Sequence, residues 1–139
     1  MFVADCLQVN KQGHLCMEEL DVLELAAKYG TPLYVMSETQ IRKNCRMYQD
    51  SLKRFYGGNG LALYASKAFC CKEICRIAAQ EGMGLDVVSG GELYTAVSAG
   101  FSPEKIYFHG NNKTAPELVA ALEQKVGTIV VIIWKNWKC

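Results

Sequence analysis

Three side chains of different chemistry accompany short apolar runs in this sequence. Lys67 follows the run 61–65, Asp86 lies inside a second run, and His109 directly follows a third. Partial burial of a lysine at a strand end favours its neutral amine, the form that attacks an aldehyde. An amine, a carboxylate and an imidazole thus recur at corresponding places along the chain. These three residues are the candidate site residues.

Each candidate also has an explanation that involves no chemistry. Lys67 could be a solvated charge at a strand end, since lysines are mostly exposed in folded proteins. Asp86 could form a turn, and His109 could be a satisfied histidine at the edge of the core. Glu92, in the segment Ser-Gly-Gly-Glu at 89–92, could serve equally as a helix cap or as a site residue.

The apolar runs alternate with helical patterns. The sequence predicts strands at 61–65, 85–88, 105–108 and 129–133, and helices at 71–81, at 93–99 and after Thr114. Strands that alternate with helices at this spacing indicate a parallel sheet wound with helices, which is an α/β fold. In such folds the loops at the carboxyl ends of the strands carry the site. Lys67, Asp86 and His109 are expected near that edge.

Upstream of these units the pattern is more varied. Asp21 is predicted to cap a helix that Gly30 ends, and residues 33–36 are predicted to form a strand. Ser37 is predicted to cap a long amphipathic helix, since apolar residues recur after it at spacings of three and four. Residues 1–16 are weakly patterned apart from a turn signal, and His14 beside that turn is expected to be an exposed loop histidine.

Composition narrows the class of protein. Fifteen basic and fourteen acidic residues create no field that would attract nucleic acid or an anionic membrane. The start of the chain lacks the pattern of a signal peptide, and its apolar runs are too short to span a bilayer. The seven cysteines include no C-x-x-C pair, so free thiols are expected and no metal site. A soluble cytoplasmic protein is expected.

Several motifs together resemble one enzyme family. Residues 64–68 (Tyr-Ala-Ser-Lys-Ala) resemble the lysine motif of the pyridoxal-phosphate decarboxylases with an alanine-racemase-like barrel. Residues 84–93 and 108–113 (Phe-His-Gly-Asn-Asn-Lys) are similar to later motifs of the diaminopimelate decarboxylases, and 26–35 to their N-terminal segment. The lysine motif is shared with ornithine and arginine decarboxylases, whereas the stretch that begins at His109 points more narrowly to diaminopimelate. The resemblance covers roughly residues 8–131.

This resemblance implies a fold, a cofactor and a reaction. Lys67 would form the Schiff base with pyridoxal 5'-phosphate, and Asp86 and His109 would line the cofactor side of the pocket. The reaction would be decarboxylation of meso-diaminopimelate, an amino-acid substrate, to L-lysine and carbon dioxide. The whole chain, 1–139, would be the first half of a TIM-type (β/α)8 barrel, with a lead-in over about 1–30 and an atypical tail over about 132–139.

The chain holds about four strand–helix units, whereas a complete barrel of this type has eight and roughly 200 residues or more. Activity of so short a chain is therefore expected to be impaired or absent. The resemblance implies a homodimer for the full-length family, and a second polypeptide could supply the missing half here. The sequence also leaves two alternatives open. One is a fragment of an ornithine- or arginine-type decarboxylase, and the other is a non-catalytic flavodoxin-like binding domain.

Overall fold

The computed structural model describes residues 5–131, which fall into two compact units divided between Asn44 and Cys45. The expected tail at 132–139 and the end of the strand predicted at 129–133 lie outside the described residues. No helix within the described range is long and apolar enough to cross a membrane.

The N-terminal unit begins with a three-stranded antiparallel sheet. Its strands are β1 (Leu7–Val9), β2 (Leu15–Met17) and β3 (Leu20–Asp21), in the order β1-β2-β3. The side-chain oxygen of Asn10 accepts hydrogen bonds from the backbone N–H groups of Gln12 and His14 at 3.0 and 2.9 Å, which closes the predicted turn. Strands of three residues are too short to show the alternation of apolar and polar residues that indicates a strand, so the sequence did not predict this sheet.

Asp21 ends the sheet and caps the next helix. Its carboxylate accepts a hydrogen bond from the backbone N–H of Leu23 at 2.8 Å, and α1 (Val22–Tyr29) follows, as predicted. The same carboxylate lies 2.7 Å from Nδ1 of His14. His14 lies in a loop, as expected, but its side chain is only 40 % exposed and its ring is paired with an acid that follows it by seven residues.

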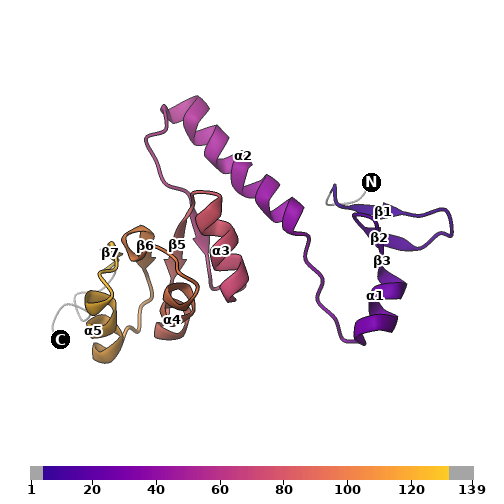
Figure 1. Ribbon diagram of the computed structural model, residues 1–139. Coiled ribbons are helices and arrows are strands. Elements are labelled where there is room, and N and C mark those ends of the chain that lie inside the picture. Colours follow the sequence, from indigo (N-terminus) through magenta and orange to yellow (C-terminus); the bar gives the residue numbers. More distant parts are fainter. Residues whose placement is uncertain (1–4, 132–139) are drawn as a thin grey trace. The chain divides into compact units, whose positions relative to one another are not determined.

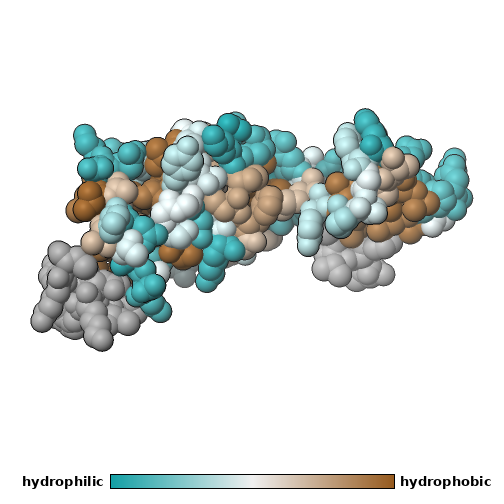
Figure 2. Space-filling view, turned by 90° about the horizontal axis from the view of Figure 1, so that it is seen from below, coloured by the Kyte–Doolittle hydropathy of each residue, from teal (hydrophilic) through white to brown (hydrophobic). Residues whose placement is uncertain are grey.

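The strand predicted at 33–36 is also wrong. Residues 33–36 belong to no sheet, and the Tyr34 side chain is 97 % exposed. An apolar run becomes a strand only where a neighbour pairs its backbone N–H and C=O groups, and neither sheet of the described chain provides that neighbour here. Apolar side chains therefore reach the surface of the N-terminal unit, as the brown areas of Figure 2 show.

The predicted long helix is present as α2 (Glu38–Tyr56), which runs across the boundary between the units. The hydroxyl of Ser37 accepts a hydrogen bond from the backbone N–H of Gln40 at 3.0 Å, so the predicted cap is confirmed.

The C-terminal unit continues with alternating strands and helices (Figure 1). In chain order these are β4 (Leu63–Ala65), α3 (Lys72–Gln80), β5 (Gly84–Val87), α4 (Gly90–Ser98), the 3-10 turn η1 (Pro103–Lys105), β6 (Ile106–Phe108), α5 (Ala115–Glu123) and β7 (Thr128–Ile129). The strands form one parallel sheet in the order β4-β5-β6-β7. The predicted α/β fold is confirmed, with each strand beside the one that follows it in the chain.

The connections of this sheet place all three crossover helices on one face. Each crossover moves to the next strand in the same direction, and such crossovers are right-handed almost without exception. The contacts of α3 with α4 and of α4 with α5 agree with this arrangement. On the two central strands, β5 and β6, the side chains that point towards the helices are fully buried, namely Leu85, Val87, Ile106 and Phe108.

The opposite face of the sheet carries a different row of side chains. The register aligns Ala65, Asp86, Tyr107 and Thr128 across the four strands, and all four are partly exposed. Because side chains alternate between the two faces of a strand, Asp86 lies on the face away from the helices, between the buried residues Leu85 and Val87. This alternation makes a carboxylate available in the middle of an otherwise apolar strand.

Candidate functional site

The three candidate residues lie towards the carboxyl edge of the parallel sheet, as expected. Lys67 is in the turn that follows β4, Asp86 is near the end of β5, and His109 comes directly after β6. The strands are parallel and in register, so their carboxyl ends share one edge of the sheet. What differs among the three residues is how the surrounding chain holds them.

The turn that carries Lys67 is anchored by the residue before it. Ser66 is only 1 % exposed. Its backbone N–H and its hydroxyl both donate to the carbonyl oxygen of Asp86, at 3.0 and 2.7 Å. The turn after β4 is thereby fastened to β5 through two hydrogen bonds, which fixes the point from which the Lys67 side chain leaves the sheet.

Lys67 itself is exposed, so the expectation of partial burial is wrong for the described chain. It extends beyond the last paired residues of the strand, Ala65 and Asp86, where neither neighbouring strand nor helix covers it. Within residues 5–131 its ammonium group makes no hydrogen bond and no ion pair. The primary amine at this edge is therefore accessible to a bound molecule.

Glu92 connects the turn after β4 to the end of β5. Its carboxylate accepts a hydrogen bond from the backbone N–H of Val88 at 2.9 Å. It also shares the single hydroxyl proton of Ser66 with the carbonyl oxygen of Asp86. The cap of α4 is the hydroxyl of Ser89, which accepts from the backbone N–H of Glu92 at 3.3 Å. Glu92 thus takes part in the start of the helix, as one interpretation predicted, and also supports the turn next to Lys67.

Asp86 and His109 are in direct contact. A carboxylate oxygen of Asp86 is hydrogen-bonded to Nδ1 of His109, and their side chains are 21 % and 34 % exposed. An ionised carboxylate can only accept, so Nδ1 carries the proton and Nε2 remains available. The backbone N–H of His109 also donates to the carbonyl oxygen of Val87 at 2.8 Å. Carboxylate and imidazole form one oriented pair at the edge.

Two further residues near this edge of the sheet were not among the predicted site residues. Lys113 is buried, and its ammonium donates to the carbonyl oxygens of Gly110 and Val130 at 2.6 and 2.8 Å. Glu117, in α5, accepts a hydrogen bond from the backbone N–H of Gly90 at 2.7 Å. Lys113 lies in the motif that begins at His109, but only its burial distinguishes it from a surface lysine.

These residues fit the aldehyde end of pyridoxal phosphate. An accessible primary amine without a partner in the described chain is the group that an aldehyde requires, and a carboxylate-oriented imidazole lies at the same edge of the sheet. Lys67 is the residue that would hold the cofactor, and Asp86 and His109 are the residues that would line it.

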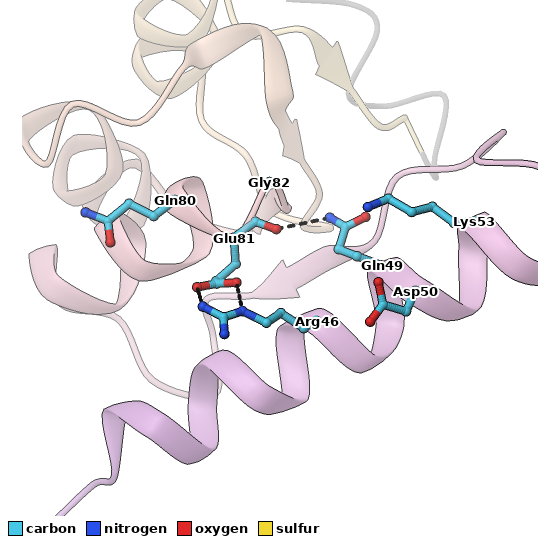
Figure 3. A pocket seen from close by; sticks show the side chains of 7 residues that line it. All are labelled: Arg46, Gln49, Asp50, Lys53, Gln80, Glu81 and Gly82. Atoms are coloured by element: carbon cyan, nitrogen blue, oxygen red, sulfur yellow. Dashed lines mark hydrogen bonds and ion pairs between the residues drawn. The ribbon is translucent and has the colours of Figure 1, made fainter.

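A hollow of about 370 Å³ lies elsewhere, between α2 and the turn after α3 (Figure 3). The guanidinium of Arg46 donates to both carboxylate oxygens of Glu81, at 2.7 and 2.9 Å, and the amide of Gln49 points at the carbonyl of Glu81. This turn precedes β5, so the hollow belongs to the amino end of the strand. It contains none of the candidate residues, and its ion pair packs the helix against the turn.

Comparison with known proteins identifies close relatives. The model of the pyridoxal-dependent decarboxylases, pyridoxal binding domain, matches residues 38–133. The chain is 48 % identical to a diaminopimelate decarboxylase of Bacillus methanolicus over 131 residues, which are 94 % of this chain and 30 % of that protein. It is 49 % identical to the enzyme of Bacillus subtilis over 134 residues, again 94 % and 30 %. The chain thus spans less than a third of the length of these curated relatives.

Solved structures agree with the sequence matches. Diaminopimelate decarboxylase from M. jannaschii superposes with a TM-score of 0.85 at 40 % identity, over 92 % of this chain and 30 % of that one. The same enzyme in complex with L-lysine gives a TM-score of 0.85 over 94 % and 31 %. The described strands and helices therefore form part of a decarboxylase barrel. This likeness favours the barrel over the flavodoxin-like domain that the strand–helix alternation also allowed.

Proposed function

Because the chain belongs to the pyridoxal-dependent decarboxylases, we propose that it carries the cofactor lysine of an enzyme that decarboxylates meso-diaminopimelate to L-lysine. The observation that supports this most directly is the accessible amine of Lys67, which follows the anchored residue Ser66 at the carboxyl edge of the sheet. The identity of almost one half with two diaminopimelate decarboxylases supports the choice of substrate.

In this proposal each candidate residue has a separate role. Lys67 holds the cofactor through its primary amine. When bound, the cofactor supplies an electron sink for the electron pair that remains as carbon dioxide leaves. Asp86 keeps the proton of His109 on Nδ1 and fixes the orientation of the ring, so that the imidazole offers a defined face and Nε2 to the cofactor side of the pocket.

The proposal also includes the assembly. The four described parallel strands are half of the eight in the barrel that the family resemblance implies. Full activity then requires further strand–helix units, from a complementing polypeptide or within a longer protein, and a homodimer is the expected assembly. The reaction would take place in the cytoplasm, as part of lysine biosynthesis.

Reductive labelling tests the role of Lys67. The purified chain is incubated with pyridoxal phosphate, reduced with borohydride, and digested for peptide mass mapping. We expect one pyridoxyl group per chain, on Lys67. Lys67→Ala should abolish this label, and Lys72→Ala should leave it unchanged, since Lys72 is a second exposed lysine five residues further along. Labels scattered over the surface lysines, or none at all, would contradict the proposal.

Release of carbon dioxide tests the substrate. The chain is combined with a polypeptide that carries the remaining part of a diaminopimelate decarboxylase, and carbon dioxide is measured with meso-diaminopimelate, L-ornithine and L-arginine. We expect release from meso-diaminopimelate, and its loss in Lys67→Ala. Preferential release from ornithine or arginine would instead place the chain with the related decarboxylases that share the lysine motif.

A further inference from the structure

Lys113 is a lysine inside the C-terminal unit. It is 7 % exposed, whereas lysines are almost never buried unless they are paired. It directly precedes Thr114, the residue that caps α5, and it ends the loop that begins at His109. A buried ammonium in a loop beside the candidate site calls for a physical reason.

Backbone carbonyls and an aromatic ring surround this ammonium. It donates to the carbonyl oxygens of Gly110 and Val130, at 2.6 and 2.8 Å, and lies 5.8 Å from the centre of the Phe108 ring. Within the described residues no carboxylate lies at ion-pairing distance from it. Burial of a charge without a carboxylate partner is costly, and burial lowers the pKa of Lys113. Such a group adds little to stability compared with an apolar side chain of the same length.

What the ammonium does provide is a bridge. Gly110 belongs to the loop after β6, and Val130 follows β7, so one side chain joins the ends of two neighbouring strands. Val130 is also held by its backbone N–H, which donates to the carbonyl oxygen of Phe108 at 2.9 Å. An apolar side chain could fill the same space, but it could not satisfy two carbonyl groups at once.

The bridge formed by Lys113 holds the residue that directly follows His109. Gly110 has φ +104°, and a Cβ at this position would lie 2.8 Å from the carbonyl oxygen of Val88. The backbone of Gly110 is thus pressed against the end of β5 on one side and held by Lys113 through its own carbonyl. His109, one residue earlier, donates its backbone N–H to Val87. The orientation of His109 therefore depends on how the following peptide is held.

We propose that Lys113 is a positioning residue for His109. Its ammonium fixes the peptide of Gly110 to the end of β7 and thereby keeps the imidazole in contact with Asp86 at the carboxyl edge. The inference rests on the proposed function only in taking His109 to be a site residue, since the contact itself is a property of the chain without cofactor. Lys113 does not touch the reacting atoms in this proposal.

Hydrogen exchange and nitrogen NMR of the cofactor-free chain test this inference. In Lys113→Met, which keeps an unbranched side chain as far as Cε and removes the ammonium, the amides of His109 and Val130 should exchange about tenfold faster or more. The imidazole nitrogen signals of His109 should shift in the same direction as in Asp86→Ala. The core amides of Leu85 and Ile106 should keep their exchange rates. Lys113→Arg, which retains donors and charge, should restore part of the protection.

Lys105→Met is the matched control, since Lys105 is an exposed lysine at the other end of β6 and should change neither readout. Unchanged His109 signals in Lys113→Met, or an equal increase in exchange at every amide, would overturn the inference. If Lys113→Met does not fold, the inference is tested by NMR of the unmodified chain. The ammonium protons of Lys113 should then give a slowly exchanging signal with a nuclear Overhauser contact to Gly110, and the absence of this contact would also overturn it.

None of these hydrogen-exchange and NMR measurements involves cofactor or substrate. A negative result here therefore leaves the labelling of Lys67 as a separate test, and unlabelled Lys67 would not by itself affect the bridge.

Discussion

The carboxylate of Glu117 accepts a hydrogen bond from the backbone N–H of Gly90 at 2.7 Å, although the two residues belong to different helices. The same carboxylate accepts from the backbone N–H and the hydroxyl of Thr114, each at 2.9 Å. One side chain thus caps α5 and also the first turn of α4. A Cβ at Gly90 would lie 3.0 Å from Cγ of Glu117, which explains why glycine suits this position. The contact joins the first turns of α4 and α5, the helices that follow β5 and β6.

Glu117→Gln should lower the free energy of unfolding in a pH-dependent way. Hydrogen bonds from Thr114 and Gly90 hold the pKa of Glu117 below its ordinary value of 4.5. A carboxyl group whose pKa is lowered by folding stabilises the folded chain above its unfolded pKa, and this contribution disappears as the pH falls through the folded pKa. We expect a loss of about 1 kcal/mol at pH 7, measured by urea unfolding, and a smaller loss at pH 3.

Glu123→Gln is the matched control, because Glu123 is exposed at the end of the same helix. It should change the stability little at either pH. A loss in Glu117→Gln that is equal at pH 7 and pH 3 would show that the charge of the carboxylate plays no part.

Gly110→Ala should destabilise the chain more than Gly100→Ala. Both glycines have positive φ angles, +104° and +81°, but only at Gly110 would the added Cβ meet a backbone oxygen, that of Val88 at 2.8 Å. Nothing lies within 4 Å of a Cβ at Gly100. A left-handed conformation alone costs about 1 kcal/mol, and the close contact should add roughly 1–2 kcal/mol. Thermal and urea unfolding measure the difference, and equal losses would argue against the close packing of this loop.

Cys75 should resist alkylation in the folded chain. It lies on the buried face of α3 and is 0 % exposed, and burial raises the pKa of its thiol to about 12. Because the thiolate is the reactive form, iodoacetamide at pH 8 should leave Cys75 unmodified while it labels Cys71, which is half-buried at the start of the same helix. Peptide mass mapping in buffer and in urea distinguishes the two. Labelling of Cys75 in buffer at the rate seen in urea would contradict its burial.

Stability at alkaline pH should depend on Lys113. Burial lowers the pKa of Lys113 below 10.5, and the nearby Glu117 opposes that shift. Between the folded pKa and 10.5 the unfolded chain therefore binds more protons, so the contribution of Lys113 to stability rises with pH in this window. The free energy of unfolding of the unmodified chain should therefore rise relative to Lys113→Met as the pH increases towards 10.5. The same comparison with Lys105→Met corrects for other groups, and a difference that does not change with pH would be inconsistent with burial of the charge.

Local sequence signals predicted those elements whose causes are local. The caps at Asp21 and Ser37 depend on a side chain and a backbone N–H a few residues away, and the periodicity of α2 lies within one segment. Sequence also located Lys67, Asp86 and His109 at strand ends, because the alternation of strands and helices determines which residues reach the carboxyl edge of a parallel sheet. The antiparallel sheet at β1–β3 was not predicted, and the strand predicted at 33–36 was wrong. In both cases strand formation depends on a pairing neighbour that the periodicity of one segment does not reveal.

The sequence by itself determined the α/β class, the family and the residues available for chemistry at one edge of the sheet. The tertiary structure alone decided how that edge is held together. Ser66 and Glu92 are 26 residues apart, Gly90 and Glu117 are 27 apart, and Lys113 and Val130 are 17 apart. Each contact joins segments that follow neighbouring strands, and only the parallel register of the strands brings these segments side by side. Only the structure shows that Lys67 is exposed and that Lys113 is buried, because the sequence around a lysine does not reveal which neighbours will cover its side chain.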